Sequence, residues 1–279
     1  MLGALSSRAA RLAMSYAGCT IVITGASDGI GAELARLLAG EKPNLVLAAR
    51  NAEALERTAG LCRARGAAVL VAPTDVSIES DCERLIAQAV ERFGGIEVLV
   101  ANAGVSMHAR FDQITDFSTF ERLWRVNCMG TVWCVRHAWP QLKASRGHVV
   151  GVSSLAGKTG VPGRTTYCAS KFALSGFLDA LRIEADEFGI AVTAIYPGVV
   201  ATDIRRHGLD GAGGAAGRAG RDEAGAMPVD QCARQVLAAM RSRRRELVMT
   251  AKGRIGLWLK LIAPGLVDRM ARAALAKEH

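Results

Sequence analysis

Residues 24–31 read Thr24-Gly25-Ala26-Ser27-Asp28-Gly29-Ile30-Gly31 and join an apolar run at 19–24 to a helical pattern at 32–38. Glycines at such a strand-to-helix turn let the backbone approach a pyrophosphate, and the start of the helix offers N–H groups and partial positive charge. The spacing G-x-x-x-G-x-G is a variant of the dinucleotide fingerprint. A tight turn without a ligand is the alternative, but the context favours a nucleotide site formed by Gly25, Ser27, Asp28, Gly29, Ile30 and Gly31.

Apolar runs of strand length alternate with amphipathic stretches along the rest of the chain. The predicted strands, rich in Val, Ile and Leu without polar alternation, are 19–24, 45–49, 68–72, 96–101, 149–152, 191–196 and 246–249. Such runs are typical of a sheet covered on both faces. Helical spacing of apolar residues recurs near 30–40, 52–65, 79–93, 117–144, 168–188 and 229–242. The order predicts an α/β fold, a doubly wound parallel sheet of about seven strands with helices on both faces.

Length and composition predict one main domain. The chain has 279 residues, is 50% hydrophobic and 22% charged, and has a net charge of +9, which argues against a disordered, collagen-like or coiled-coil protein. We expect a flexible leader at 1–18, a catalytic domain at 19–250 and a basic, apolar helical extension at 251–279. The substrate loop is expected at about 198–227, where Asp203 to Met227 is rich in Gly, Ala and Arg, which is typical of a lid or a disordered loop.

The cysteines and histidines favour a cytoplasmic protein without a metal. The 7 cysteines are odd in number and form no C-x-x-C pair, a pattern typical of reduced thiols. No apolar run reaches the ~18 residues that span a bilayer, so any membrane contact is expected to be peripheral. Residues 1–18 lack the apolar region of a secretory signal, and a transit-like leader is the alternative. The 5 histidines show no ligand spacing.

The positive charge lies at the two ends of the chain. Residues 241–279 contain ten Lys or Arg and three acids, Arg8 and Arg11 supply the rest, and the region 28–240 is neutral. Nucleic-acid binders usually carry a basic stripe over the folded surface, so nucleic acid is not an expected partner. The favoured interpretation of the basic, apolar C-terminal segment is a packed helix, and weak contact with an anionic membrane surface is the alternative.

The residues after the second predicted strand bear on cofactor choice. Folds that select NAD place an acid there, on the ribose 2′-hydroxyl. This chain has Arg50 and Asn51, and a guanidinium can hold a 2′-phosphate with charge-assisted hydrogen bonds. The sequence therefore favours NADP(H) over NAD(H), although Arg50 stacked on adenine is a simpler alternative and Asp28 supplies no positive charge to the site.

Tyr167 and Lys171 stand four residues apart after the fifth predicted strand. If Pro162 and Gly163 end the loop and the helix begins near Thr166, both side chains project from one helix face. A tyrosine acts as an acid or base near neutrality only if its pKa of about 10 falls by roughly three units, and an ammonium about 4 Å away supplies an effect of that size. We therefore expect Lys171 to activate Tyr167. An exposed lysine beside a packed tyrosine is the alternative.

Asn127 is the only strongly polar side chain in the helical stretch 126–135. A buried amide without hydrogen-bond partners costs about 1 to 3 kcal/mol, so its polar groups must be satisfied. Asn127 either ties loops of the sheet together or bends the helix so that a backbone carbonyl can hold a water for proton relay.

These motifs together resemble the classical short-chain dehydrogenase/reductase family. The match covers residues 19 to about 202 and continues from the glycine turn through Asn102-Ala103-Gly104, Asn127, Ser154, Tyr167 with Lys171, Pro197-Gly198 and Thr202. The resemblance implies a Rossmann-type domain in which Tyr167 exchanges a proton with a substrate carbonyl or alcohol. It also implies that Lys171 binds the nicotinamide ribose, Ser154 binds the substrate oxygen and Asn127 maintains the relay water.

The same resemblance implies the remaining cofactor contacts. Asp75 and Val76 would receive the adenine edge, and Asn102, Ala103 and Gly104 would line the cofactor. Val200 and Thr202 would fix the carboxamide, next to Pro197 and Gly198 of the family motif.

The predicted helix 170–188 has two apolar sides. One side carries Phe172, Ala173, Gly176, Phe177 and Ala180, and the other carries Leu174, Leu178 and Leu181. A helix apolar on two sides must bury both. The sheet can cover one side and a second subunit the other, so we expect a homodimer or a homotetramer, as the family resemblance also implies.

The combined prediction is an NADP(H)-dependent oxidoreductase that interconverts a carbonyl and an alcohol on a mainly hydrophobic small molecule, by hydride transfer with Tyr167 as acid or base. The candidate pocket walls are Met107, His108, Leu155, Val161, Pro162 and Arg164. The alternatives are a non-catalytic dinucleotide-sensing or regulatory protein, and a 3-ketoacyl-type reductase that contacts a membrane surface through its C-terminus.

Overall fold

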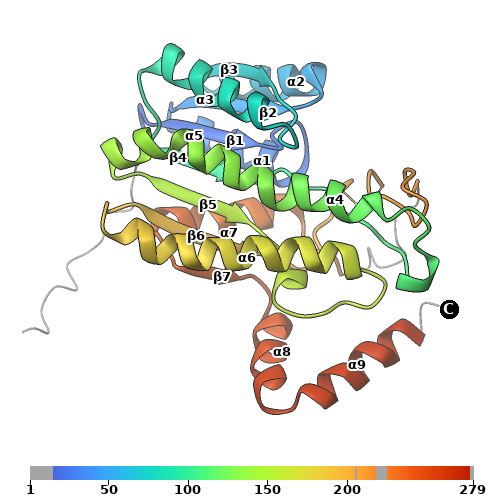
Figure 1. Cartoon of the computed structure of the whole chain (residues 1–279). Coiled ribbons are helices and arrows are strands. Elements are labelled where there is room, and N and C mark those ends of the chain that lie inside the picture. The colour runs from blue at the N-terminus through green and yellow to red at the C-terminus, as the bar shows by residue number, and fades with distance from the viewer. Residues whose placement is uncertain (1–14, 205, 218–224, 277–279) are drawn as a thin grey trace, which may run out of the picture.

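The computed structural model describes residues 15–204, 206–217 and 225–276. Its seven strands form one sheet in the order β3-β2-β1-β4-β5-β6-β7, and every neighbouring pair is parallel (Figure 1). The strands are β1 (Thr20–Thr24), β2 (Asn44–Ala49), β3 (Ala68–Pro73), β4 (Val98–Ala101), β5 (His148–Val152), β6 (Ala191–Tyr196) and β7 (Glu246–Val248). The predicted doubly wound parallel sheet is confirmed, with strand ends within two residues of the predicted runs.

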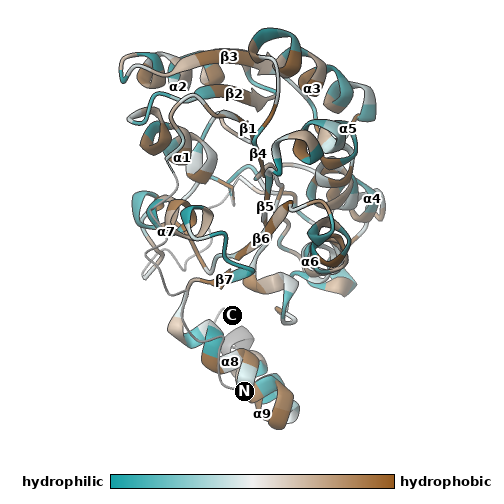
Figure 2. Ribbon diagram, turned by 90° about the vertical axis from the view of Figure 1, so that its left-hand side faces the viewer, coloured by the Kyte–Doolittle hydropathy of each residue, from teal (hydrophilic) through white to brown (hydrophobic). Residues whose placement is uncertain are grey.

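Helices cover both faces of the sheet (Figure 2). One face carries α1 (Gly29–Ala39), α2 (Ala52–Arg63) and α7 (Val229–Arg241), and the other carries α3 (Glu79–Phe93), α5 (Gly130–Ser145) and α6 (Thr165–Asp186). Each strand feeds both cores, because successive side chains point to opposite faces. Ile21 and Ile23 enter one core and Val22 the other, which is why the strands carry apolar residues without alternation.

The predicted helix at 117–144 is interrupted. It consists of α4 (Ser118–Trp124), a π-helical turn η2 (Arg125–Met129) and α5, and a short 3₁₀ turn η1 (Phe111–Gln113) precedes it. In the π turn the Gly130 N–H reaches back to the Arg125 carbonyl, five residues earlier. Sequence periodicity did not reveal this break because the apolar pattern continues through it.

The folded body begins before the predicted boundary at residue 19. Tyr16, assigned to the flexible leader, is fully buried, and its N–H donates to Glu41 Oε2 at 2.8 Å, so the folded body includes it. Residues 1–14 of the leader lie outside the described residues. Part of the predicted lid is anchored to the body, because the Gly211 carbonyl accepts hydrogen bonds from the backbone N–H groups of Thr115 and Asp116.

The C-terminal extension projects from the body as two helices, α8 (Ala251–Ile262) and α9 (Pro264–Ala276), below β7 in both views (Figures 1 and 2). No residue of α8 is buried. Gly253 and Leu257 are half-buried, so α8 rests on the body along one side and is only partly packed. Within the described ranges, no helix is both long and apolar enough to cross a membrane.

The strand order reverses between β1 and β4, because β2 and β3 extend the sheet on one side of β1 and β4 to β7 extend it on the other. In open α/β sheets the crevice outside the carboxyl ends of the strands at such a point is the usual ligand site. The glycine turn after β1 and the Asn102-Ala103-Gly104 segment after β4 both lie at this crevice.

Candidate active site

A groove of about 1050 Å³ opens at the point where the strand order reverses. Thirteen of the predicted cofactor residues line it: Gly25, Ser27, Asp28, Gly29, Ile30, Arg50, Asn51, Asp75, Val76, Asn102, Ala103, Gly104 and Thr202. The groove runs from the residues after β2 and β3 to the segment after β4, and its floor is the glycine turn. Its shape and lining fit an extended ligand with a phosphate group near the start of α1.

The glycine turn is held closed by Asn102. Its amide Nδ2 donates to the carbonyls of Thr24 and Gly25, at 3.0 and 3.1 Å. Gly25 has φ +66°, and a Cβ on it would come within 2.8 Å of Asn102 Nδ2. Gly31 lies behind the groove, where a Cβ would overlap the Gly25 carbonyl oxygen. Asn102 and Gly31 therefore hold the shape of the glycine turn, whereas Gly25 and Gly29 face the groove itself.

Three of the polar residues predicted at the groove are already engaged in local hydrogen bonds. Asp28 caps α1 by accepting from Gly29 N at 2.6 Å, and Asn51 caps α2 by accepting from Ala54 N at 3.0 Å. Asp75 Oδ1 accepts from the N–H and the hydroxyl of Ser77, at 2.9 and 2.7 Å. These contacts fix the groove walls.

Nine further residues line the groove and were not predicted from the sequence: Ala49, Ala54, Thr74, Val105, Val126, Asp203, Ile204, His207 and Arg57. Arg57 brings a second guanidinium to the end that holds Arg50, and it pairs with Glu53 at 2.8 Å. Ala54 and Arg57 follow Asn51 at intervals of three residues on a predicted helix, so this spacing could have identified them. The low-complexity segment offered no comparable signal for Asp203, Ile204 and His207.

The inner end of the groove meets the predicted catalytic residues at Gly104. A Cβ on Gly104 would lie 3.1 Å from Asn127 Oδ1 and 3.5 Å from Lys171 Nζ. Gly104 is a groove residue, whereas Asn127 and Lys171 come from η2 and α6. The backbone of Gly104 therefore separates the groove from the side chains of Asn127 and Lys171.

Lys171 is buried in the protein interior, with 3% of its surface exposed. Its ammonium donates to the Val152 carbonyl at 3.0 Å, at the end of β5. Burial disfavours the charged form and lowers the pKa of Lys171 from 10.5 to about 8. With a pKa of about 8, the buried ammonium remains mostly charged at pH 7.

Tyr167 lies one helical turn before Lys171 and is 8% exposed. The Lys171 ammonium and the Arg164 guanidinium each lie 6.0 Å from the centre of the Tyr167 ring. Both cations therefore lie next to the ring that carries the predicted proton donor. The predicted helix start near Thr166 agrees with the observed start at Thr165.

Asn127 is fully buried within the π turn, and its amide makes three hydrogen bonds. Its Oδ1 accepts from Val105 N at 2.8 Å, and its Nδ2 donates to Val105 O and to Ser170 Oγ, both at 2.9 Å. The side chain thus ties the segment after β4 to α6, next to Tyr167. These hydrogen bonds make Asn127 a tie between loops, and its role in holding a relay water stays a prediction.

Ser154 follows β5 and caps the 3₁₀ turn η3 (Leu155–Gly157), where its hydroxyl accepts from Ala156 N at 3.2 Å. A Cβ on Gly157 would lie 2.6 Å from the Lys171 carbonyl oxygen, so this turn packs directly on α6. Pro197, Gly198 and Val200 lie outside the groove lining. Pro197 O accepts from Leu155 N at 2.9 Å, which places this segment against η3.

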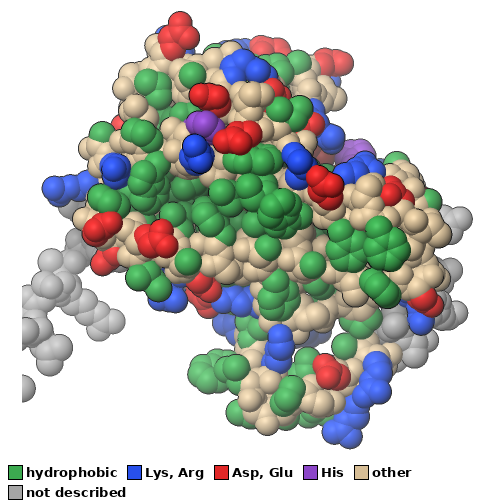
Figure 3. Space-filling view, viewed as in Figure 1, with side chains coloured by type: hydrophobic (Ala, Val, Ile, Leu, Met, Phe, Trp, Pro, Cys, Tyr) green, Lys and Arg blue, Asp and Glu red, His purple; other side chains and the backbone are tan. Residues whose placement is uncertain are grey.

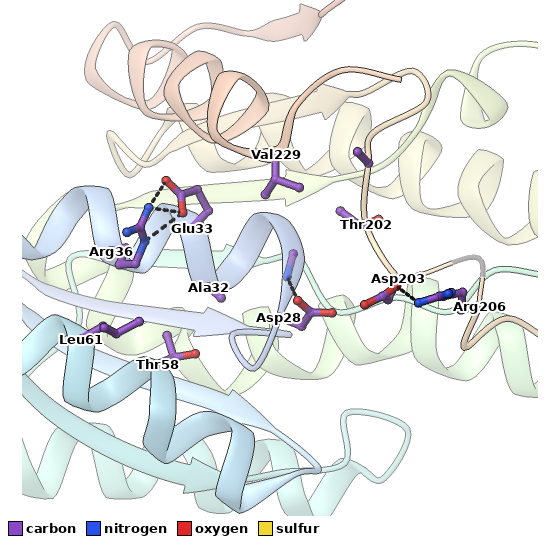
Figure 4. A pocket seen from close by; sticks show the side chains of 12 residues that line it. Asp28, Ala32, Glu33, Arg36, Thr58, Leu61, Thr202, Asp203, Arg206 and Val229 are labelled. Atoms are coloured by element: carbon purple, nitrogen blue, oxygen red, sulfur yellow. Dashed lines mark hydrogen bonds and ion pairs between the residues drawn. The ribbon is translucent and has the colours of Figure 1, made fainter. Parts of the chain in front are cut away.

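A second cavity of about 500 Å³ adjoins the groove and shares Asp28, Gly29, Thr202 and Asp203 with it (Figure 4). Both of its cations are paired with acids. Arg36 binds Glu33 at 2.6 Å, and Arg206 lies 3.5 Å from Asp203. Among the described residues that line it, this cavity therefore has no unpaired cation for a phosphate. In the described ranges, no group of three or more His, Cys, Asp or Glu residues could hold a metal ion.

The sheet topology and the groove at the carboxyl ends of the strands define a Rossmann-type α/β protein. Comparison with known proteins identifies the family. The family model for short chain dehydrogenase matches residues 19–211. The chain is 33% identical over 262 residues to "Dehydrogenase/reductase SDR family protein 7-like" of Dictyostelium discoideum, covering 91% of this chain and 81% of that protein. It is 34% identical over 269 residues to "Dehydrogenase/reductase SDR family member 7B" of Bos taurus, covering 93% and 82%.

Solved structures agree with this assignment. A short chain dehydrogenase/reductase from Burkholderia phymatum in complex with NAD has a TM-score of 0.80 and 26% identity, covering 91% of this chain and 96% of that one. An alcohol dehydrogenase from Thermococcus sibiricus complexed with 5-hydroxy-NADP has a TM-score of 0.72 and 27% identity, covering 82% and 94%. The chain belongs to the short-chain dehydrogenase/reductase family, oxidoreductases that act on alcohol or carbonyl groups with a nicotinamide dinucleotide.

Proposed function

We propose that the protein is an NADP(H)-dependent oxidoreductase that interconverts a carbonyl and an alcohol on a mainly hydrophobic small molecule. The observation that carries this proposal is the junction at Gly104, where the dinucleotide groove meets Asn127 and Lys171. A bound nicotinamide would supply or accept the hydride. The protein must then supply or accept the proton at the substrate oxygen.

The side chains around this junction would transfer the proton, hold positive charge and position the substrate. Tyr167 gives its phenolic proton to the substrate oxygen on reduction, or takes it on oxidation, a contribution of about 10² to 10⁴ in rate. Lys171 holds positive charge next to the ring and lies within reach of a ribose at the inner end of the groove. Ser154 orients the substrate oxygen from η3, and Asn127 holds the backbone of Val105 and the turn at Ser170 in place.

The surroundings of Tyr167 support a hydrophobic substrate. Its ring belongs to an apolar cluster whose other buried members are Met107, Ala109, Ile114, Leu123, Ala156, Cys168 and Leu209. This cluster is separate from the two cores that stabilise the sheet. An apolar wall next to a proton donor favours carbonyl compounds with a substantial apolar portion. The free cysteines, six of them buried, support the further proposal of a reducing, cytoplasmic location.

The preference for NADP(H) is proposed from Arg50 and Arg57. Both line the end of the groove next to α2, and no acidic side chain follows β2 directly. Because Arg57 already pairs with Glu53, we expect Arg50 to contribute more than Arg57 to the binding of a 2′-phosphate.

Arg50→Ala is expected to weaken NADPH binding by roughly ten- to a hundredfold, since a hydrogen bond to a charged group contributes about 1.5 to 3 kcal/mol. NADH binding should change little, because NADH has no 2′-phosphate. Titration of the intrinsic protein fluorescence with each nucleotide measures both affinities. Equal losses for the two nucleotides would contradict the assignment.

The proposed activity can be tested by following NADPH consumption with steroid, 3-ketoacyl, quinone and sugar carbonyl compounds, and repeating the series with NADH. We expect turnover with apolar carbonyl compounds and faster turnover with NADPH. A protein that binds NADPH and turns over none of these substrates would instead support a dinucleotide-sensing role.

We also propose a homodimer or a homotetramer formed through α6. On this helix Leu174, Leu178 and Leu181 are buried against the sheet, whereas Phe172, Gly176 and Ala180 are exposed. Figure 3 shows hydrophobic side chains gathered over α5 and α6 on the same face of the molecule. Such a patch is typical of a subunit interface.

Ala180→Arg is expected to dissociate the oligomer, because it places a charge in the centre of the proposed contact. Size-exclusion chromatography with light scattering would measure the change in mass. Ile78→Arg, on the body surface away from α6, serves as the matched control. A wild-type protein that is strictly monomeric would contradict the proposal.

A further inference from the structure

The C-terminal helices carry an exposed apolar stripe. On α8, Ile255, Trp258, Leu261 and Ile262 recur at helical spacing and are 67%, 72%, 76% and 80% exposed. On α9, Leu266 and Met270 are also exposed. Large apolar side chains exposed to this degree on neighbouring turns are unusual on a water-facing surface and mark a contact site.

The opposite side of α8 fixes this stripe in an outward direction. A Cβ on Gly253 would lie 2.9 Å from Leu155 Cδ1, so α8 packs directly on η3. Lys260 donates to the Lys158 carbonyl at 3.0 Å, and its ammonium lies 5.4 Å from the centre of the Phe172 ring. These contacts hold the residues at 253 and 260 against the body. The stripe residues lie on the other side of α8 and are consequently turned away from the body.

The charge of the two helices selects the partner. Residues 251–276 contain five cations, Lys252, Arg254, Lys260, Arg269 and Arg272, and Asp268 as the only acid. Helical spacing places Lys252 at one edge of the stripe on α8, next to Ile255. Arg254 lies in line with Trp258 and Ile262, and its guanidinium donates to the Val248 carbonyl at 3.1 Å. Figure 3 shows hydrophobic and basic side chains next to each other on this projecting pair. Two copies meeting through this same surface would bring like charges together.

Apolar side chains bordered by cations match an anionic lipid surface, where the apolar groups enter the headgroup region and the cations remain at the phosphates. Trp258 has the amphipathic ring that is enriched at this depth of a bilayer. We propose that the surface formed by α8 and α9 docks on an anionic membrane through the stripe Ile255, Trp258, Leu261 and Ile262. The helices lie on the bilayer and do not cross it.

Docking in this orientation also places the proposed active site near the bilayer. Leu155, which contacts α8, directly follows Ser154 in the chain. This part of the inference rests on the proposed function, and it deepens that function by favouring carbonyl substrates that are dissolved in lipid.

The test is flotation of the full-length protein with vesicles of phosphatidylcholine alone or of phosphatidylcholine with phosphatidylserine. We expect the protein to float with the anionic vesicles and to remain largely unbound with the neutral ones. Trp258→Glu and, separately, Leu261→Glu should each reduce the bound fraction at least about tenfold, because each removes a large apolar side chain from the lipid and adds a repelled charge. Lys252→Glu with Arg269→Glu should reduce binding only to the anionic vesicles.

Ile78→Glu is the matched control, since it replaces a 48% exposed apolar side chain with the same charge on the body surface. It should float like the wild type. Circular dichroism and chromatographic mass confirm that each variant is folded. Absence of flotation, or flotation that Trp258→Glu and Leu261→Glu leave unchanged, would overturn the proposal. A loss of oligomer mass in these variants without any loss of flotation would assign the stripe to a second copy of the chain and would also overturn it.

Flotation requires no turnover, so its result stands whether or not an activity is found. If the protein floats and turns over NADPH, anionic vesicles should raise the rate with a lipid-dissolved ketone and leave the rate with a water-soluble one unchanged. The absence of turnover would count against the proposed function and leave the docking surface intact.

Discussion

Replacing Tyr167 with Phe is expected to lower the turnover number by about 10² to 10⁴ and to leave NADPH affinity nearly unchanged. The substitution removes the phenolic hydroxyl and keeps the ring, which packs in the apolar cluster with Met107 and Leu209. Tyr167 does not line the groove, so the nucleotide contacts at the glycine turn are retained. Steady-state rates together with nucleotide titration separate the two effects.

The matched control is Tyr16→Phe. Tyr16 is also buried, and within the described part of the chain its hydroxyl has no hydrogen-bond partner. Removing that hydroxyl should therefore be neutral or slightly stabilising and should leave turnover intact. Normal turnover in Tyr167→Phe would show that another group moves the proton.

Lys171→Met is expected to abolish turnover and at the same time to stabilise the protein without its cofactor. Burial lowers the pKa of Lys171 from 10.5 to about 8, which corresponds to roughly 3 kcal/mol of unfavourable free energy at neutral pH. Loss of the charge-assisted hydrogen bond to the Val152 carbonyl returns about 2 kcal/mol of that gain. The net expectation is a free energy of unfolding about 1 kcal/mol higher at pH 7.

The pH dependence of this difference has a defined sign. Between pH 8 and 10.5 the unfolded chain keeps the Lys171 proton and the folded protein has lost it. The stability contribution of this group in the wild type therefore rises with pH across that window, and the advantage of the variant disappears. Urea unfolding at pH 7 and near pH 10.5 measures both values. Lys252→Met, at an exposed lysine, should show no such trend, and an equal advantage of Lys171→Met at both pH values would contradict the assignment.

The strands could be predicted closely because each is a short, uninterrupted apolar run, and parallel strands buried on both faces require such runs. The i, i+4 spacing of Tyr167 and Lys171 likewise predicted a shared helix face. The π turn at 125–129 could not be predicted, because it depends on the tertiary hydrogen bonds of Asn127 to Val105 and Ser170. The local spacing of apolar residues does not indicate hydrogen bonds to partners that are distant in the sequence.

The C-terminal helices could be predicted as helices, but their exposure could not be predicted. Apolar residues at helical spacing are compatible with packing on the body and with exposure. The contacts of Gly253, Arg254 and Lys260 with the body decide between them. The groove residues Asp203 and His207 come from a segment rich in Gly and Ala, where no pattern marks them. Such loop residues can be assigned to the groove only once the structure of the domain around the loop is known.

The π turn also sets the rotational phase between α4 and α5. It contains one residue more than a regular turn would need, and each added or deleted residue rotates the following helix by about 100°. Gly130, at the start of α5, lies so close to Val76 that a Cβ would fall 2.9 Å from Val76 Cβ. A single insertion or deletion between Leu123 and Gly130 would therefore disturb both the groove wall at Val76 and the hydrogen bonds of the Asn127 amide. When the domain is redesigned or recombined, the length of this segment is thus constrained as tightly as its composition.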